Sequence, residues 1–191
     1  MTFDYTDAST QREFDLIPHG TLATVQMNIQ PGGAGEGGIL SRSKNGDCEM
    51  LKSEFTVVEG EYARRKFWER FVLAGTTDGH AKAVEISRSK LRGILESARG
   101  IKPDDTSPQA RAARTVELAA FDGLRFVARI GVEKGGENSG GGNYPDRNFL
   151  LTAITPDRRD WHAVERTASP PHSSPPTAPA AVAVPKPAWA S

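Results

Sequence analysis

Residues 60–73 read GEYARRKFWERFVL, a run that combines four cations and four aromatic side chains with the composition of a β-strand. Because successive side chains of a strand point to opposite faces, Lys66, Trp68 and Arg70 share one face. An aromatic ring between two cations suits single-stranded nucleic acid, whose bases offer flat faces and whose backbone is negatively charged. The run therefore predicts a strand that presents a nucleic-acid-binding face.

The opposite face of the same run carries Phe67 and Phe71, which can contribute to a core. Arg65 and Glu69 also fall on that face, so the separation of apolar and charged side chains is incomplete. Aromatic residues in strands are usually buried. Two orientations of Trp68 therefore stay open at this point, one as a stacking platform for bases and one as a residue of the core.

The charged residues are balanced over the whole chain and uneven along it. The 191 residues include 24 Lys and Arg against 24 Asp and Glu. Residues 1–60 hold four basic and nine acidic side chains, a net −5; residues 61–100 hold nine and five, a net +4; residues 101–166 hold ten of each. An anion-binding surface is expected to centre on the middle of the chain, with an ordinary solvated helix face as the alternative source of this charge.

Few residues suit catalysis, metal binding or nucleotide binding. Cys48 is the single cysteine and the four histidines show no ligand spacing, so we expect no disulfide, no metal site and no cofactor. The glycine-rich stretches lack the G-x-x-x-x-G-K-[ST] pattern, and no serine or cysteine lies in a nucleophile elbow. We expect a protein that is not an enzyme. A metal-dependent nuclease built from separated carboxylates is the catalytic alternative.

No run of the chain predicts membrane targeting. The acidic N-terminus lacks the apolar segment of a signal peptide, and no segment has the apolar length of a transmembrane helix. We therefore expect a soluble, cytoplasmic protein with no membrane partner. The sequence does not determine an oligomeric state.

Hydrophobic periodicity predicts five strands and one helix. Alternating apolar residues predict strands at 21–30, 48–58, within 60–73, and at 124–133 and 148–155. A helical period covers 80–99, with Thr77 or Asp78 to cap its start and Gly100 at its end. The charged side of this helix, which includes Arg92 and Glu96, is expected to face solvent. Residues 103–115 are expected to form a loop or a short helix.

Two glycine-rich loops join the predicted strands, 31–38 between the first and second and 135–146 between the fourth and fifth. Five strands with one helix after the third are compatible with the OB-fold, a partly open barrel whose binding face is flanked by these two loops. The predicted fold class is thus mainly β with one helix (α+β), an OB-like five-stranded barrel followed by a disordered tail. The expected domains are an irregular lead-in at 1–18, an OB-like domain at 19–162 and a Pro- and Ala-rich tail at 163–191.

The same sequence also resembles a family of small phage and prophage proteins known as DUF669. Its G-E-Y-x-x-R-K-hydrophobic-x-x-R region is similar to residues 60–70, and its central helix and last two strands are similar to residues 81–91, 126–135 and 144–148. The likeness runs from about residue 16 to residue 157. It implies a bacterial host, a place in phage DNA replication or recombination, and OB-like binding of single-stranded DNA.

Together these features predict a phage or prophage single-stranded DNA-binding protein that acts in DNA replication or recombination. The candidate phosphate contacts are Lys66, Arg70, Lys134 and Arg147, and the candidate stacking residues are Trp68 and Tyr144. Solvation of a hairpin end is the alternative role of the three candidates beside the second glycine loop. The alternative function is a non-enzymatic adaptor, whose same face binds a phage replication or recombination protein. The balanced net charge favours this alternative.

Overall fold

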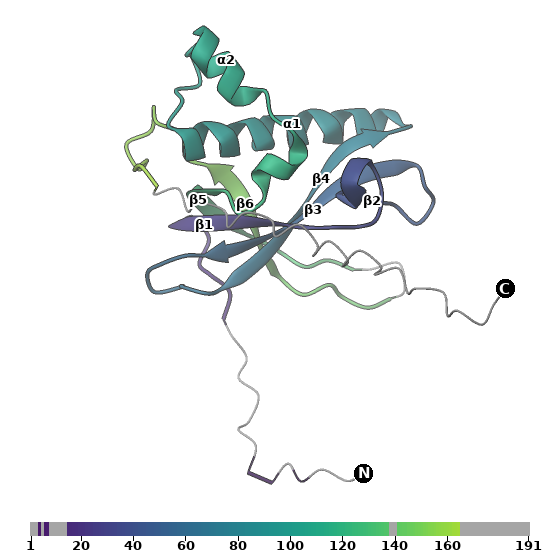
Figure 1. Ribbon diagram of the computed structural model, residues 1–191. Coiled ribbons are helices and arrows are strands. Elements are labelled where there is room, and N and C mark those ends of the chain that lie inside the picture. Colours follow the sequence, from purple (N-terminus) through teal and green to yellow (C-terminus); the bar gives the residue numbers. More distant parts are fainter. Residues whose placement is uncertain (1–3, 5, 8–14, 138–140, 165–191) are drawn as a thin grey trace, which may run out of the picture.

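The computed structural model describes residues 4, 6–7, 15–137 and 141–164 (Figure 1). Its strands are β1 (Thr21–Gln30), β2 (Ser41–Arg42), β3 (Cys48–Val57), β4 (Lys66–Gly75), β5 (Arg125–Glu133) and β6 (Arg147–Ala153). Its helices are α1 (Asp78–Arg99) and α2 (Pro108–Arg114), with short 3-10 turns η1 (Glu36–Gly38) and η2 (Leu118–Phe121). The five long strands and the long helix follow one another in the order expected from the sequence.

All the strands belong to one antiparallel sheet. The five long strands lie in the order β4-β3-β1-β5-β6, and the two-residue β2 pairs with the first residues of β3. The chain makes β1, β3 and β4 consecutively and then returns through α1 to place β5 beside β1, which is a Greek-key arrangement. Helices α1 and α2 lie together on one side of the molecule, and the β5–β6 hairpin extends away from them (Figure 1).

The five-stranded barrel predicted from the sequence is not confirmed. In the described residues the sheet has six strands and does not close, because β4 and β6 at its two ends form no ladder. The Glu69 side chain instead spans the opening and accepts a hydrogen bond from the Leu150 backbone N–H at 3.2 Å. The mainly β class with a long helix is correct, and α2 is the short helix that residues 103–115 offered as one of two alternatives, whereas the sequence did not reveal the two-residue β2.

The predicted alternation in the strands is confirmed by the core. Met27 on β1 and Phe55 on β3 are fully buried, and the register places them side by side. The Phe55 ring stacks on Phe67 of β4 at 5.1 Å and meets the edges of Phe71 and Phe126 at 6.4 and 5.8 Å. Four aromatic rings from three strands thus form the centre of the core.

The strand predicted within residues 60–73 occupies the second half of that run and continues to Gly75. Residues 60–65 form a turn, and the strand begins only at Lys66. Gly60 and Arg64 both have positive φ, 85° and 69°, which is incompatible with an extended strand. The Arg64 backbone N–H donates to the Val57 carbonyl at 2.8 Å, so the turn closes the β3–β4 hairpin.

Helix α1 begins and ends where its sequence predicts. The Thr77 hydroxyl accepts a hydrogen bond from the His80 N–H at 3.2 Å, and Gly100 ends the helix with a left-handed φ of 66°. Glu96, however, was expected on the solvated side and is only 3% exposed. It accepts hydrogen bonds from Arg92 and Arg114 at 2.7 and 2.8 Å, because α2 and the loop before it cover this part of the helix.

Packing begins before the predicted start of the domain. Ile17 is buried, and its backbone N–H and carbonyl bond to the Asn148 side chain at 2.9 and 2.8 Å. Residues 131 positions apart in the sequence are thereby joined, since Asn148 belongs to β6. Of the tail predicted at 163–191, residues 165–191 lie outside the described residues.

Candidate nucleic-acid interface

The two faces of β4 carry the two kinds of side chain that the sequence pattern separates. Phe67 and Phe71 are 2% and 1% exposed, whereas Trp68 is 52% exposed on the opposite face. Lys66 and Arg70 flank Trp68 on that outer face and are also exposed. Of the two orientations that the sequence left open, Trp68 takes the outward one, with its ring accessible between two cations.

The outer face continues across two neighbouring strands as a polar surface. Residues paired directly across an antiparallel sheet place their side chains on the same face. Three such rows cross β1, β3 and β4: Gln26 with Thr56 and Lys66, Asn28 with Glu54 and Trp68, and Gln30 with Lys52 and Arg70. Trp68 is the one aromatic residue in these rows, and the other members are hydrogen-bonding or charged groups suited to phosphates and base edges.

A groove of about 740 Å³ opens where the start of β4 faces the start of β6. It is lined by Leu16, Ala63, Arg64, Arg65, Lys66, Phe67, Trp68, Asp146, Arg147 and Asn148. Three of the six predicted site residues, Lys66, Trp68 and Arg147, therefore share one groove although they lie up to 81 positions apart. The apolar part of its lining suits a base, and the cations on its rim suit a phosphate.

The other three candidates lie around this groove rather than in its lining. Arg70 is two residues farther along the outer face of β4 than Trp68. Tyr144 is 63% exposed on the β5–β6 loop. Lys134 lies at the beginning of the same loop. It is linked to the groove through Asp146, which lines the groove and accepts a hydrogen bond from the Lys134 ammonium group at 2.7 Å. The structure brings four candidates close to one another and places Arg70 and Tyr144 at the periphery.

The neck of the β5–β6 loop is closed by Asp146. Its carboxylate accepts hydrogen bonds from the Lys134 side chain at 2.7 Å and from the Gly135 backbone N–H at 2.9 Å. These two donors hold the pKa of Asp146 below its ordinary value, the Lys134 bond contributing most. A side chain at Gly135 would collide with the Tyr144 carbonyl, so the two sides of the neck approach as closely as the backbone allows. This closure fixes the position of Arg147, the next residue.

Carboxylates already neutralise three of the four predicted phosphate contacts. Lys66 pairs with Glu54 at 2.8 Å, Lys134 with Asp146 at 2.7 Å, and Arg147 with Glu133 at 2.6 Å. The sequence did not reveal these partners, because each lies on a neighbouring strand or across a loop. Among the described residues Arg70 forms no such ion pair.

Sequence reasoning missed some members of this surface. Leu16 was assigned to the irregular lead-in, and its place in the groove follows from the anchoring of Ile17 beside it. Arg64 and Arg65 lie on the turn before β4, and Arg65 donates to the Asp15 carbonyl. Lys52 is the cross-strand neighbour of Arg70. Its alternation with buried Leu51 and Ser53 in the predicted strand was the signal that could have identified it.

Three further observations concern the part of the chain that the structure describes. There, no three His, Cys, Asp or Glu side chains lie close enough together to hold a metal ion. The described helices also include none with the length and apolar character needed to cross a membrane. His19 and His162 make ordinary structural contacts, with the Val132 N–H at 3.2 Å and the Thr24 hydroxyl at 3.1 Å.

Comparisons with protein-family models, with curated proteins and with solved structures found no match to this chain. The resemblance to the DUF669 family therefore stays a prediction that rests on the sequence motifs alone. What the chain does must be inferred from the outer face of β4 and from the groove beside it.

Proposed function

We propose that this protein binds single-stranded DNA on the outer face of β4, without strong preference for base sequence. The observation that carries the proposal is the exposed Trp68 between Lys66 and Arg70. Its ring offers a stacking surface that any base can use, and the flanking cations lie where a backbone would pass. Tyr144, Lys134 and Arg147 would contact the same strand where it leaves the groove.

The strand order supports an OB-like interpretation of the fold. The five long strands follow a Greek-key path, with α1 between the third and fourth of them, and β4 and β6 face each other across the opening. Glycine-rich connections join the first long strand to the second and the fourth to the fifth, where an OB-fold carries its binding loops. In this proposal the sheet is an OB-like barrel that stays open between β4 and β6.

The resemblance to DUF669 supports a role in phage or prophage DNA replication or recombination in a bacterial host. Binding without sequence preference suits that role, because a replication intermediate exposes any sequence. The ion pairs of Lys66, Lys134 and Arg147 make the affinity modest, since a phosphate must compete with the carboxylate already bound to each cation. No cofactor or catalytic step is part of this proposal.

Fluorescence anisotropy with single- and double-stranded oligonucleotides at low salt tests the proposal. We expect the wild-type protein to prefer the single strand. Loss of one stacked base in Trp68→Ala should cost about 1–3 kcal/mol, a roughly 5- to 150-fold weaker affinity. Ile86→Ala is the matched control, because Ile86 is 50% exposed on α1, away from the groove. Equal affinities of wild type and Trp68→Ala would refute the proposed interface, and no binding at low salt would refute the function.

The salt dependence gives a second, independent readout. Four phosphate contacts predict that log K falls with log salt concentration with a slope of about −2.8. Arg70→Gln should reduce this slope by about 0.7, because one contact is removed. A slope near zero would mean that the strand is not held by its phosphates.

The second candidate function is a protein-interaction adaptor. One observation favours it: the groove combines exposed apolar side chains, Leu16 and Trp68, with cations that already have carboxylate partners. Such a surface can bury a partner's apolar side chain without needing a polyanion. Partners retained in a pull-down after nuclease treatment, together with undetectable oligonucleotide binding, would decide for the adaptor.

A further inference from the structure

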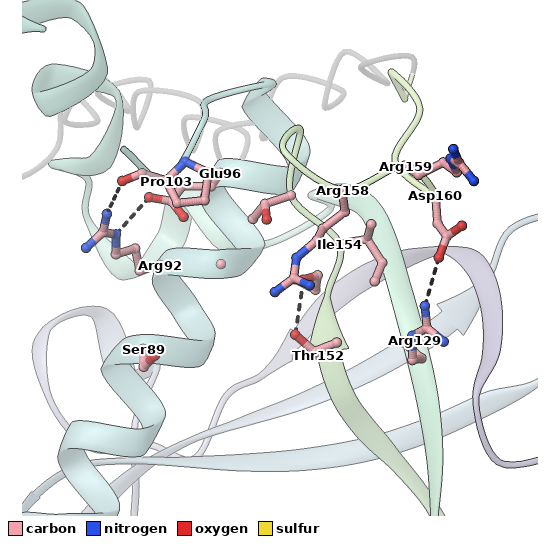
Figure 2. A pocket seen from close by; sticks show the side chains of 13 residues that line it. Ser89, Arg92, Glu96, Pro103, Arg129, Thr152, Ile154, Arg158, Arg159 and Asp160 are labelled. Atoms are coloured by element: carbon pink, nitrogen blue, oxygen red, sulfur yellow. Dashed lines mark hydrogen bonds and ion pairs between the residues drawn. The ribbon is translucent and has the colours of Figure 1, made fainter. Parts of the chain in front are cut away.

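A second cleft, of about 700 Å³, lies between α1 and the segment that follows β6 (Figure 2). Its walls come from α1, from Pro103, from β5 and from the stretch 152–160 at and after the end of β6, so segments far apart in the sequence build it together. The polar side chains of its lining include Ser89, Arg92, Arg129, Thr152, Arg158 and Asp160. The volume is in the range of sites that hold a small molecule.

The lining of this cleft is rich in arginine. Four arginines line it against two carboxylates, which leaves two positive charges in excess. Among the ion pairs of the described residues, two bring a further charge to the lining, Arg114 on Glu96 and Asp157 beside Arg158, and these two charges cancel each other. The excess therefore stays at two, in a protein whose net charge is zero.

Two of the guanidinium groups are held in fixed positions on opposite walls. Arg92 donates from Nε to Glu96 at 2.7 Å and from Nη2 to the Pro103 carbonyl at 2.7 Å. Arg129 donates from Nη2 to Asp160 at 2.9 Å. Each guanidinium has five N–H donors, so both keep donors available after these contacts. Groups that are already fixed bind an anion with little loss of side-chain freedom.

A third guanidinium lies between these walls. Figure 2 shows Arg158 reaching from the segment after β6 into the space between Arg92 and Arg129. Its carboxylate neighbour, Asp157, is 3.6 Å away, beyond ordinary hydrogen-bond distance. The Ser89 hydroxyl adds a neutral donor to the lining, whereas the Thr152 hydroxyl already donates to the Ala153 carbonyl at 3.2 Å. An anion in the cleft would therefore meet guanidinium donors from three sides.

We propose that this cleft binds a phosphomonoester group. A phosphomonoester carries about −1.5 to −2 charges at neutral pH, which matches the excess of two positive charges. Its tetrahedral oxygens accept paired hydrogen bonds from guanidinium groups, whereas a carboxylate would balance only half of the charge. The group belongs either to a free nucleotide or to the terminal phosphate of an oligonucleotide. The site is separate from the groove at Trp68 and does not rest on the proposed function.

Binding can be tested by NMR on the ¹⁵N-labelled full chain, with inorganic phosphate and a nucleoside monophosphate as probes at constant ionic strength. We expect saturable shifts of the Arg92, Arg129 and Arg158 Nε–H signals and of the amides of residues 152–160. The same shifts should remain in Trp68→Ala, even if DNA binding at the groove fails. Shifts confined to Arg64 and Arg147, or no saturable shifts with either probe, would overturn the proposal.

A comparison of 5′-phosphorylated and 5′-hydroxyl forms of one short single strand distinguishes the two sources of phosphate. A roughly tenfold tighter affinity of the phosphorylated form would identify a strand end as the ligand. Equal affinities, together with saturable binding of the mononucleotide, would identify a free nucleotide. Either result supports a phosphomonoester site in this cleft.

Two variants locate the binding. Arg129→Gln/Arg158→Gln should weaken phosphate binding at least tenfold. Gly93→Glu should do the same while every arginine stays in place, because Gly93 lines the cleft and the substitution adds a negative charge there. The new side chain has room, since a Cβ at Gly93 meets only Ala153, at an ordinary 3.7 Å. Arg42→Gln is the matched control, as Arg42 is an exposed arginine paired with Glu49 at 3.0 Å away from the cleft. Unchanged phosphate binding in both folded variants would overturn the proposal.

Discussion

On the inner face of β4, Phe67 and Phe71 are almost completely buried, while on the outer face Trp68 is half exposed between two charged side chains. The two faces come from alternate residues of one strand, so they share the same backbone, the same neighbouring strands and the same backbone hydrogen bonds. They differ in what touches them. The inner face meets other aromatic rings, and the outer face meets cross-strand polar residues and solvent.

This difference separates stability from recognition within one strand. Removing an inner side chain opens a cavity, because the surrounding rings cannot collapse fully. An outer side chain packs on one side only, so its removal leaves no enclosed void. A large aromatic residue that contributes little to stability, between two cations, is available for a ligand. The four predictions below test this separation, from the largest expected effect to the smallest.

The first prediction compares neighbouring aromatic residues on the two faces. Phe67→Ala should lower the free energy of unfolding by about 3–5 kcal/mol, because it removes a ring that stacks on Phe55 at 5.1 Å. Trp68→Ala should change it by less than about 0.5 kcal/mol. Urea unfolding followed by circular dichroism measures both. Similar losses of stability in the two variants would show that side chains on the outer face stabilise the fold as much as those of the core.

The second prediction concerns the one carboxylate on the inner face of β4. Glu69 accepts from the Leu150 N–H at 3.2 Å and pairs with Lys90 at 3.4 Å, so it links β4 to β6 and to α1. Glu69→Ala should cost about 1–3 kcal/mol of unfolding free energy, because a partly buried donor loses its acceptor. Glu85→Ala, on the exposed side of α1, is the control and should leave stability unchanged. A neutral effect of Glu69→Ala would mean that β4 and β6 are held by other contacts.

The third prediction removes a negative charge from the outer face. Glu54 lies beside Trp68 in the sheet and pairs with Lys66 at 2.8 Å. Glu54→Gln should strengthen single-stranded DNA binding about fivefold at low salt, since removing one like charge near a phosphate is worth about 1 kcal/mol. Added salt should erase the gain. Glu49→Gln, which breaks the pair with Arg42 elsewhere on β3, is the control. Weaker binding of Glu54→Gln would contradict a phosphate path past Lys66.

The fourth and smallest effect is a pH-dependent opening of the loop neck. The bonds from Lys134 and Gly135 lower the pKa of Asp146, so these contacts are complete at neutral pH and are lost only as the pH falls through this lowered pKa, below the ordinary value of 3.8. The Gly135 amide proton should shift with that titration in NMR spectra. Asp146→Asn should abolish the shift. Because Asp146 lies at the surface, the unfolding free energy should show little change over the same range.

Much of the fold could be predicted because it follows from local rules. Apolar alternation predicted β1 with its observed bounds, and Thr77 and Gly100 marked the ends of α1. These signals depend on residues close together in the chain. Strand β2 is different, because its two residues pair with β3 across the short turn at 43–47 and carry too little alternation to detect. The open edge between β4 and β6 depends on the curvature of the whole sheet.

The site was predictable only in part, because local sequence signals do not show which distant residues come together. Alternation placed Lys66, Trp68 and Arg70 on one face, and that grouping is correct. The burial of Glu96 was not predicted, because the two arginines that bind it belong to different helices. The arginine-lined cleft was missed as well, since its walls come from four separate segments and no motif marks them.

The sequence by itself determined the alternation of β4, the ends of α1 and the positive charge of the middle of the chain, because each depends on the order of neighbouring residues. The tertiary structure decided that Trp68 faces solvent, that Leu16 and Arg147 lie beside it, and that carboxylates pair with the neighbouring cations. Those facts depend on which distant strands come together. Alternation alone separates two faces of a strand, and only long-range pairing and packing determine which of them is covered.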